Sequence, residues 1–172
     1  MTDVRLVETA DADALFALRR ENRDFLAPWE PAPPPGGESL AGTRNGVAHL
    51  REAHANGTCV PLVILDGERI VGRVTLSNIV RSALQSAIVG YWVAEPDNGR
   101  GHASAAVAAV LELAFGELGL HRVEAGTLVH NTASQRVLAR NGFERYGLAP
   151  EYLRIGGRWQ DHVLFQRLAP SA

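Results

Sequence analysis

A strand-like run, a glycine-containing turn and an alanine-rich segment follow one another in this chain and most constrain its fold. Residues 86–93 are β-branched and aromatic, which is typical of a strand, whereas residues 103–118 are rich in Ala, Leu and Glu, which favour a helix. The glycines of residues 98–104 therefore fall at the turn from strand to helix. Glycine lets a backbone approach a ligand closely, and the first amides of a helix have no intrahelical partner. The turn predicts a binding site for an anion such as a phosphate.

The residues of this turn fit neither of two familiar phosphate-binding loops well. Gly101 is followed by His102 and Ala103, whereas a P-loop requires a Lys and then Ser or Thr after its last glycine. A Rossmann turn would have a glycine where Ser104 stands, and it would open an early β-α-β unit. The turn therefore predicts another kind of phosphate site, in which Arg100 adds a countercharge to the backbone amides.

The turn resembles the pyrophosphate loop of the GNAT acetyltransferases, which holds acetyl-CoA at the start of the family's central helix with the pattern Gln/Arg-x-x-Gly-x-Gly/Ala. Asn98 stands where the family more often has Gln or Arg, which weakens one side-chain contact and leaves the backbone cradle intact. Residues 131–134 and 141–144 resemble the segments around the family's second conserved helix. Residues 21–31 and 151–162 resemble the RimJ/RimL-type branch, which acetylates the N-terminal amine of ribosomal proteins.

Hydrophobic periodicity and turn residues predict an α/β chain with the element order β-α-α-β-β-β-α-β-α-β-β. The resemblance implies the GNAT fold, a mixed and mostly antiparallel sheet of about seven strands with helices on both faces and splayed central strands. Thr9 is expected to cap the first helix, and Asp66 and Gly67 to turn the first hairpin. The expected helices cover residues 9–22, 39–55, 103–118 and 131–141, and the expected later strands cover residues 58–65, 69–77, 86–93, 121–129, 143–148 and 162–168.

Length and composition predict a single domain over residues 1–172, because 172 residues with 46% hydrophobic side chains provide one sizeable core. A formal net charge of −2 gives no general attraction for nucleic acid or an anionic membrane. There is no apolar signal segment, and no run approaches the roughly 20 apolar residues of a membrane span. The single Cys59 excludes an internal disulfide. We expect a cytoplasmic protein, as a monomer or homodimer.

The resemblance implies that backbone groups at the end of the strand over residues 86–93 grip the pantetheine arm and polarise the thioester carbonyl. It also implies that Asn131 hydrogen-bonds this arm, although Asn131 is equally suited to cap the following helix. For the side chains of Trp92 and Val93, plain sheet packing is the alternative. The residues expected to bind acetyl-CoA are Trp92, Val93, Asn98, Gly99, Arg100, Gly101, His102, Ala103, Ser104, Asn131 and Ser134.

Acetyl transfer from a thioester to an amine requires a neutral amine, stabilisation of the oxyanion and a proton for the departing thiolate. Many GNAT enzymes supply this proton from a tyrosine seven residues after the asparagine, a position that is Leu138 here. In the RimL-like branch the acid is a serine three residues after the asparagine, which corresponds to Ser134. A hydroxyl can donate directly or relay a proton from water. The alternative is that Ser134 is a polar residue in the first helical turn.

Two carboxylates are candidates for the base. Glu124 alternates with Val123 and Ala125 on an expected central strand, where an ionised side chain is costly unless it faces a wet cleft or a partner. It corresponds to the glutamate with which RimI-type enzymes deprotonate the amine through water. Glu151 corresponds to the residue assigned as base in RimL-like enzymes. A structural salt bridge is the alternative for either residue.

The acceptor is expected to enter between the segment that joins the first two helices and the closing hairpin. These two walls would contribute Phe25, Trp29, Glu30, Tyr152 and Arg154. The six histidines show no ligand-like spacing, so no metal is expected. Asp161 and His162 are expected to order the last hairpin.

These features predict an acetyl-CoA-dependent N-acetyltransferase that acts on the α-amine of a protein, such as a ribosomal protein. An acetyltransferase of a small amine, such as an antibiotic or a polyamine, is the nearest alternative. A non-catalytic acyl-CoA-binding regulatory module is a third hypothesis. The absence of tyrosine at Leu138 favours this module, whereas Ser134, Glu124 and Glu151 argue against it.

Overall fold

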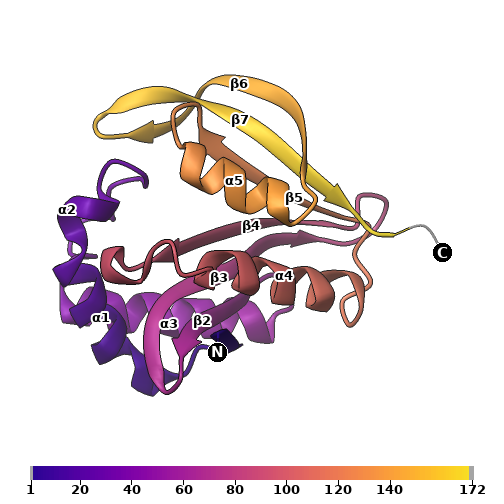
Figure 1. Cartoon of the computed structure of the whole chain (residues 1–172). Helices are drawn as coiled ribbons and strands as arrows, with labels where there is room; N and C mark the ends of the chain where they lie inside the picture. The colour runs from indigo at the N-terminus through magenta and orange to yellow at the C-terminus, as the bar shows by residue number, and fades with distance from the viewer. Residues whose placement is uncertain (1, 171–172) are drawn as a thin grey trace.

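A computed structural model describes residues 2–170 and contains one seven-stranded sheet with the strand order β1-β2-β3-β4-β5-β7-β6 (Figure 1). All neighbouring strands are antiparallel except β4 and β5, which are parallel. This mixed, mostly antiparallel sheet confirms the predicted fold class. The elements in chain order are β1 (Thr2–Leu6), the 3₁₀ turn η1 (Thr9–Asp11), α1 (Ala12–Glu21), α2 (Arg23–Leu26), α3 (Leu40–Ala55), β2 (Val60–Asp66), β3 (Arg69–Val80), β4 (Ser86–Val93), η2 (Glu95–Asp97), α4 (His102–Phe115), β5 (Arg122–Leu128), α5 (Thr132–Arg140), β6 (Glu144–Ile155) and β7 (Arg158–Leu168).

Helices cover both faces of the sheet, because successive strand side chains point in opposite directions. Along β2, Leu62 and Ile64 belong to the large core that includes α4. Val63 between them belongs to a second core with Leu15 of α1 and Val47 of α3. The α1 and α3 face is therefore separated from the α4 and α5 face by the sheet.

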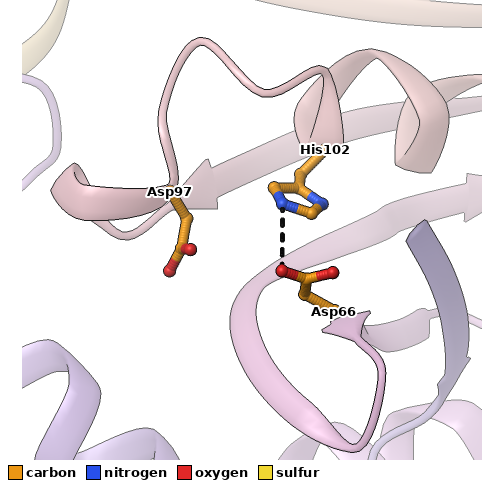
Figure 2. A group of neighbouring side chains, drawn as sticks. All are labelled: Asp66, Asp97 and His102. Carbon is orange, nitrogen blue, oxygen red and sulfur yellow. Dashed lines mark ion pairs between the residues drawn. The ribbon is translucent and has the colours of Figure 1, made fainter. Parts of the chain in front are cut away.

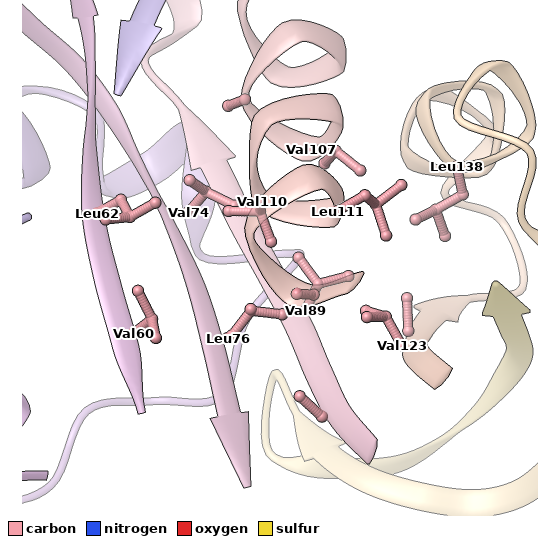
Figure 3. Close-up of a cluster of buried hydrophobic side chains, with 14 of the residues drawn as sticks. Val60, Leu62, Val74, Leu76, Val89, Val107, Val110, Leu111, Val123 and Leu138 are labelled. Atoms are coloured by element: carbon pink, nitrogen blue, oxygen red, sulfur yellow. The ribbon is translucent and has the colours of Figure 1, made fainter. Parts of the chain in front are cut away.

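The central helix α4 is held tightly against the sheet. Figure 3 shows Val107, Val110 and Leu111 of α4 between the strand side chains, with Leu138 of α5 beside them. Val107, Val110 and Leu138 are fully buried, and full burial of such a side chain contributes about 1.5–3 kcal/mol. The start of α4 is thus a fixed point on which a ligand site can be built.

Two predicted element ends differ from the structure near β1 and β2. The first helical turn is capped at Glu8 instead of Thr9, because the Glu8 backbone N–H donates to Asp11 Oδ2 at 2.8 Å. The first hairpin turns at residues 67–68, since Asp66 still pairs with Arg69 in the ladder. In both places the boundary moves by one residue.

The last two strands are longer than predicted and form an extended hairpin, which reaches over the same end of the molecule as α2 (Figure 1). The pairing of β6 with β7 shifts register between Ala149 and Leu153. Glu151 lies in this irregularity with φ of 48°. Pro150 and a left-handed residue weaken any strand pattern, which is why the sequence alone ended the strand too early.

The parallel pairing of β4 and β5 is short. It runs only from Ser86 opposite Arg122 to Ile88 opposite Glu124, and the two strands diverge beyond that point. The predicted splay of the central strands is therefore present. Within residues 2–170, no helix is both long and apolar enough to cross a bilayer.

Candidate active site

A cleft of about 720 Å³ opens where β4 and β5 diverge, a size that suits a cofactor-sized ligand. It runs from the turn before α4, past the start of α5, to the segment around α2. The structure brings together in its lining most of the residues predicted from the sequence. These are Phe25, Trp29, Trp92, Val93, Asn98, Gly99, Gly101, His102, Ala103, Ser104, Asn131 and Ser134.

The turn before α4 has the backbone geometry of an anion cradle. Gly99 and Gly101 have φ of 76° and 86°, a region that other residues rarely adopt, and Gly101 is the N-cap of α4. The Asn98 amide donates to the carbonyls of Val93 at 3.3 Å and Ala94 at 3.0 Å, which ties the turn to the end of β4. The first amides of α4 are thereby presented to the cleft without a capping side chain.

Arg100 does not line the cleft, which corrects its expected role as a phosphate countercharge. Its guanidinium lies 2.9 Å from Asp97 and 3.1 Å from Asp66. Asp97 is 3% exposed and also accepts two hydrogen bonds from Arg69, at 2.7 and 2.8 Å. Arg69, and then the charge of Arg100, hold the pKa of the Asp97 carboxyl below its usual range. Arg100 therefore holds the turn in place through Asp66 and Asp97, on the side away from the cleft.

The His102 side chain belongs to the same anchor, although its residue lines the cleft. Figure 2 shows its ring above Asp66, while Asp97 lies on the neighbouring turn. His102 Nε2 is 3.8 Å from the Asp66 carboxylate. Nδ1 lies 2.9 Å from the Thr2 hydroxyl, and the ring is buried. The ligand atoms of Asp66, Asp97 and His102 lie within 4.8 Å of one another, but Arg69 and Arg100 already supply positive charge to both carboxylates.

Ser134 is paired with a tyrosine that the sequence analysis missed. The hydroxyl of Tyr91 on β4 lies 2.8 Å from Ser134 Oγ, and the backbone N–H of Ser134 donates to Asn131 Oδ1 at 3.1 Å. Both hydroxyl-bearing residues line the cleft. Burial raises the pKa of Tyr91 to about 12, so this hydroxyl keeps its proton at neutral pH. Asn131 caps α5 and thereby fixes the position of Ser134.

The two carboxylates predicted as bases do not line the cleft. Glu124 accepts hydrogen bonds from Arg122 and Tyr146, each at 2.9 Å, so the costly charge on this central strand faces a partner instead of the cleft. Glu151 is exposed, and its backbone N–H donates to Asp161 Oδ1 at 2.9 Å. Both glutamates therefore lie outside the lining of the cleft.

The predicted acceptor wall at α2 is partly formed. Phe25 and Trp29 line the cleft, and the Trp29 ring packs against His130 with centroids 5.6 Å apart. Glu30 does not line it, because its carboxylate is held in an ion pair with Arg19. The arginine that binds Glu30 also lies over the Trp92 ring, 5.3 Å from its centroid. Glu30 thus orders the wall instead of forming it.

The opposite wall differs more from the prediction. Arg154 is exposed and donates to the Gly157 carbonyl at 3.2 Å, outside the cleft. Tyr152 does not line the cleft either, but its ring packs on His162, which does, with centroids 5.4 Å apart. The closing hairpin therefore contributes Leu153, Ile155 and His162 instead of the expected tyrosine and arginine.

Two arginines of α5 were also missed by the sequence analysis. Arg136 and Arg140 line the cleft one helical turn apart, and neighbours at this spacing share one face of a helix. The Asn141 amide donates to Ser104 Oγ at 3.2 Å, so the end of α5 lies beside the start of α4. The spacing of these arginines after Asn131 was the signal in the sequence that could have identified them.

Two polar side-chain atoms of the lining residues are buried without a hydrogen-bond partner in the described part of the chain. Trp92 Nε1 and Thr127 Oγ1 have no hydrogen-bond partner among the described residues, although buried polar groups are normally paired. Trp92 lies on β4 and Thr127 on β5, one on each side of the splay. The Trp92 ring packs against the second core, so plain sheet packing, the alternative named for this side chain, accounts for it. Thr127 alternates with Ala125 on the face of β5 that carries the large core.

A family model described as "Acetyltransferase (GNAT) domain" matches residues 3–144. The chain therefore belongs to the GNAT acetyltransferases and is an acyltransferase. It is 35% identical over 170 residues to "Probable N-acetyltransferase YjcK" of Bacillus subtilis, covering 98% of this chain and 94% of that protein. It is 34% identical over 170 residues to the "[Ribosomal protein uS5]-alanine N-acetyltransferase" of Escherichia coli, covering 98% and 88%.

Among solved structures, Mycobacterium smegmatis RimJ in complex with CoA-disulfide is similar to this chain, with a TM-score of 0.94 and 36% identity. The match covers 98% of this chain and 82% of that chain. The predicted similarity to RimJ/RimL-type acetyltransferases is confirmed.

Proposed function

We propose that this protein transfers the acetyl group of acetyl-CoA to the N-terminal α-amine of a protein. Several of its relatives are named as acetyltransferases of ribosomal proteins. The observation that carries this proposal is the single cleft that joins the glycine turn before α4, the Tyr91 and Ser134 hydroxyls and the aromatic wall at Trp29. Such a cleft lets a thioester from one side meet an amine from the other. The proposal includes a cytoplasmic location and a protein N-terminus as the partner that accepts the acetyl group.

In this proposal the backbone of residues 99–104 holds the pyrophosphate, and the backbone of Trp92, together with Thr127 and Asn131, lies along the pantetheine arm. Ser134 donates the proton to the departing thiolate, and the Tyr91 hydroxyl hydrogen-bonded to it restores that proton. Transfer is direct from thioester to amine, without a covalent enzyme intermediate. Cys59, the single cysteine, is buried, and burial raises the pKa of its thiol, which disfavours the nucleophilic thiolate.

An α-amine suits this site better than a lysine side chain. An α-amine has a pKa of roughly 7.7–8.0 against about 10.4 for lysine, so a substantial fraction of α-amines is already neutral near neutral pH. Neither Glu124 nor Glu151 lines the cleft, and the carboxylate of Asp97, which does, is paired with Arg69 and Arg100. The acceptor that needs the least deprotonation is therefore favoured.

We expect peptides that begin with Ala or Ser to gain one acetyl group at the N-terminal nitrogen. Fragmentation by tandem mass spectrometry locates this group, and the same peptides with a blocked N-terminus and a free lysine serve as the control. Modification confined to lysine side chains would contradict the proposal. Activity confined to small amines, with every free-terminus peptide unmodified, would support the small-amine acetyltransferase instead.

We also expect Arg136 and Arg140 to supply the positive charge that Arg100 does not bring to the phosphates of acetyl-CoA. Replacing both by Gln is expected to raise the Kd for acetyl-CoA about tenfold, which corresponds to about 1.4 kcal/mol. The dependence of this Kd on salt should flatten at the same time, because fewer charges are screened. Isothermal titration at several salt concentrations measures both effects.

The matched control for this double variant is Arg145→Gln, which removes an exposed arginine of β6 outside the cleft. An unchanged Kd in the double variant, or an equal change in the control, would refute the assignment. A Kd that rises with the salt dependence unaltered would show that the arginines act through folding instead of charge.

A further inference from the structure

The lining of the cleft includes a histidine, His162, that was expected from the sequence only to order the last hairpin. His162 of β7 is 3% exposed and lines the cleft, whereas both predicted carboxylate bases lie outside it. Imidazole is the side chain best suited to exchange a proton near neutral pH. The position of this ring therefore bears on how the attacking amine loses its proton.

Hydrogen bonding fixes which nitrogen of His162 is free to accept a proton. Nδ1 lies 3.0 Å from the backbone carbonyl oxygen of Gln160. A carbonyl oxygen can only accept, so Nδ1 carries the hydrogen and Nε2 carries the lone pair. The fixed partner is a backbone atom, so the ring keeps this tautomer without help from another side chain.

The strand register places His162 on the side of the sheet away from α5. Val163, the next residue of β7, packs in the core that includes Leu138 of α5, and alternate strand residues point to opposite faces. Ser134 projects from the first turn of α5 on the other side. This places a base and an acid at different sides of the splay, where one can face the amine and the other the sulfur of a bound thioester.

The surroundings of the ring leave it open toward the splay. On β5, a Cβ at Gly126 would come within 3.8 Å of His162 Cδ2, the carbon bonded to Nε2, and the glycine leaves this space free. From β6, the Tyr152 ring packs on the imidazole. The nearest charge on the same face of β5 is Glu124, which is held by Arg122, and His130 lies across the cleft against Trp29.

We infer that His162 Nε2 is the general base that accepts a proton from the attacking α-amine, an inference that rests on the proposed function. The amine nitrogen bonds to the thioester carbonyl carbon, and the carbon–sulfur bond then breaks. Of the two protons that the ammonium loses, His162 takes one and releases it to solvent. The second passes through water to the Tyr91 and Ser134 pair, which has protonated the thiolate. The products are the N-acetylated terminus and CoA with a free thiol.

The test compares wild type with His162→Phe, which keeps an aromatic ring against Tyr152 and has no nitrogen. With a peptide beginning with Ala, kcat/KM of the variant is expected to fall about 10²-fold near pH 7. The deficit should shrink above the pKa of the peptide's amine, where the amine is neutral without a base. Added imidazole should restore part of the activity of His162→Gly, while the Kd for acetyl-CoA stays close to that of wild type.

The control is His49→Gln, which replaces an exposed histidine of α3 remote from the cleft. A folded His162→Phe with wild-type kcat/KM across the pH range, or a deficit that is the same at every pH, would overturn the inference and leave the proposed function standing. Absence of peptide acetylation by the wild type itself would refute the proposed function, and this inference with it.

Discussion

Removing both hydroxyls of the Tyr91 and Ser134 pair is expected to lower kcat about 10³-fold, within the range typical of a positioned acid. The two oxygens are 2.8 Å apart in the cleft, so either one left alone can still donate to the thiolate, directly or through water. The single changes Ser134→Ala and Tyr91→Phe should therefore cost less than the double change. Steady-state kinetics with a peptide acceptor measure kcat, and titration measures the Kd for acetyl-CoA, which should change little.

The control for this prediction is Tyr146→Phe, which removes a tyrosine hydroxyl bound to Glu124 outside the cleft. A double variant that is folded and turns over at the wild-type rate would show that the thiolate leaves without help. If the fold-losses in kcat of the two single variants multiply to that of the double variant, the two hydroxyls have independent roles. Groups that act as one unit give non-additive effects.

The sequence predicted the order of the elements because each central element carries its own local signal. The β-branched run of β4, the alanine-rich α4 and the Asn131 cap of α5 all specify their structures without distant partners. Boundaries were displaced at some of the element ends. Asp66 stays in the ladder of β2, where Arg100 from the turn before α4 binds it, and the irregular β6 around Glu151 has no strand pattern to read.

The candidate site was predictable in its backbone and less so in its side chains. Gly99 and Gly101 could be identified because a left-handed turn at a helix start has few alternatives. The direction of Arg100 could not, since it depends on two carboxylates, one of them at the end of β2. Tyr91 and Ser134 are 43 positions apart in the sequence, and their contact depends on how α5 packs beside β4 in the folded protein. Side-chain partners of this kind follow from the fold and not from spacing.

The second large effect is expected from Gly72→Ala, a change in the ladder between β3 and β4. A Cβ at this position would collide with the carbonyl oxygen of Trp92 and lie 3.0 Å from the Val93 Cα. Both neighbours are backbone atoms, which cannot rotate away as a side chain can. Overpacking of this kind costs about 1–3 kcal/mol in the free energy of unfolding. Thermal melting should show a Tm lower by roughly 2–12 °C for a chain of this size.

Gly90→Ala is the matched control, because Gly90 lies in the same strand pair and a Cβ there would meet no atom within 4 Å. Its Tm should stay near that of wild type, since an added Cβ in open space brings no collision. The strand pushed by Gly72→Ala is also the one that carries Trp92 and Val93 into the cleft, so acetyl-CoA should bind this variant more weakly even where it is fully folded. The same Tm for both variants would contradict this prediction. It would mean that β3 and β4 can move apart at Gly72 without a loss of stability.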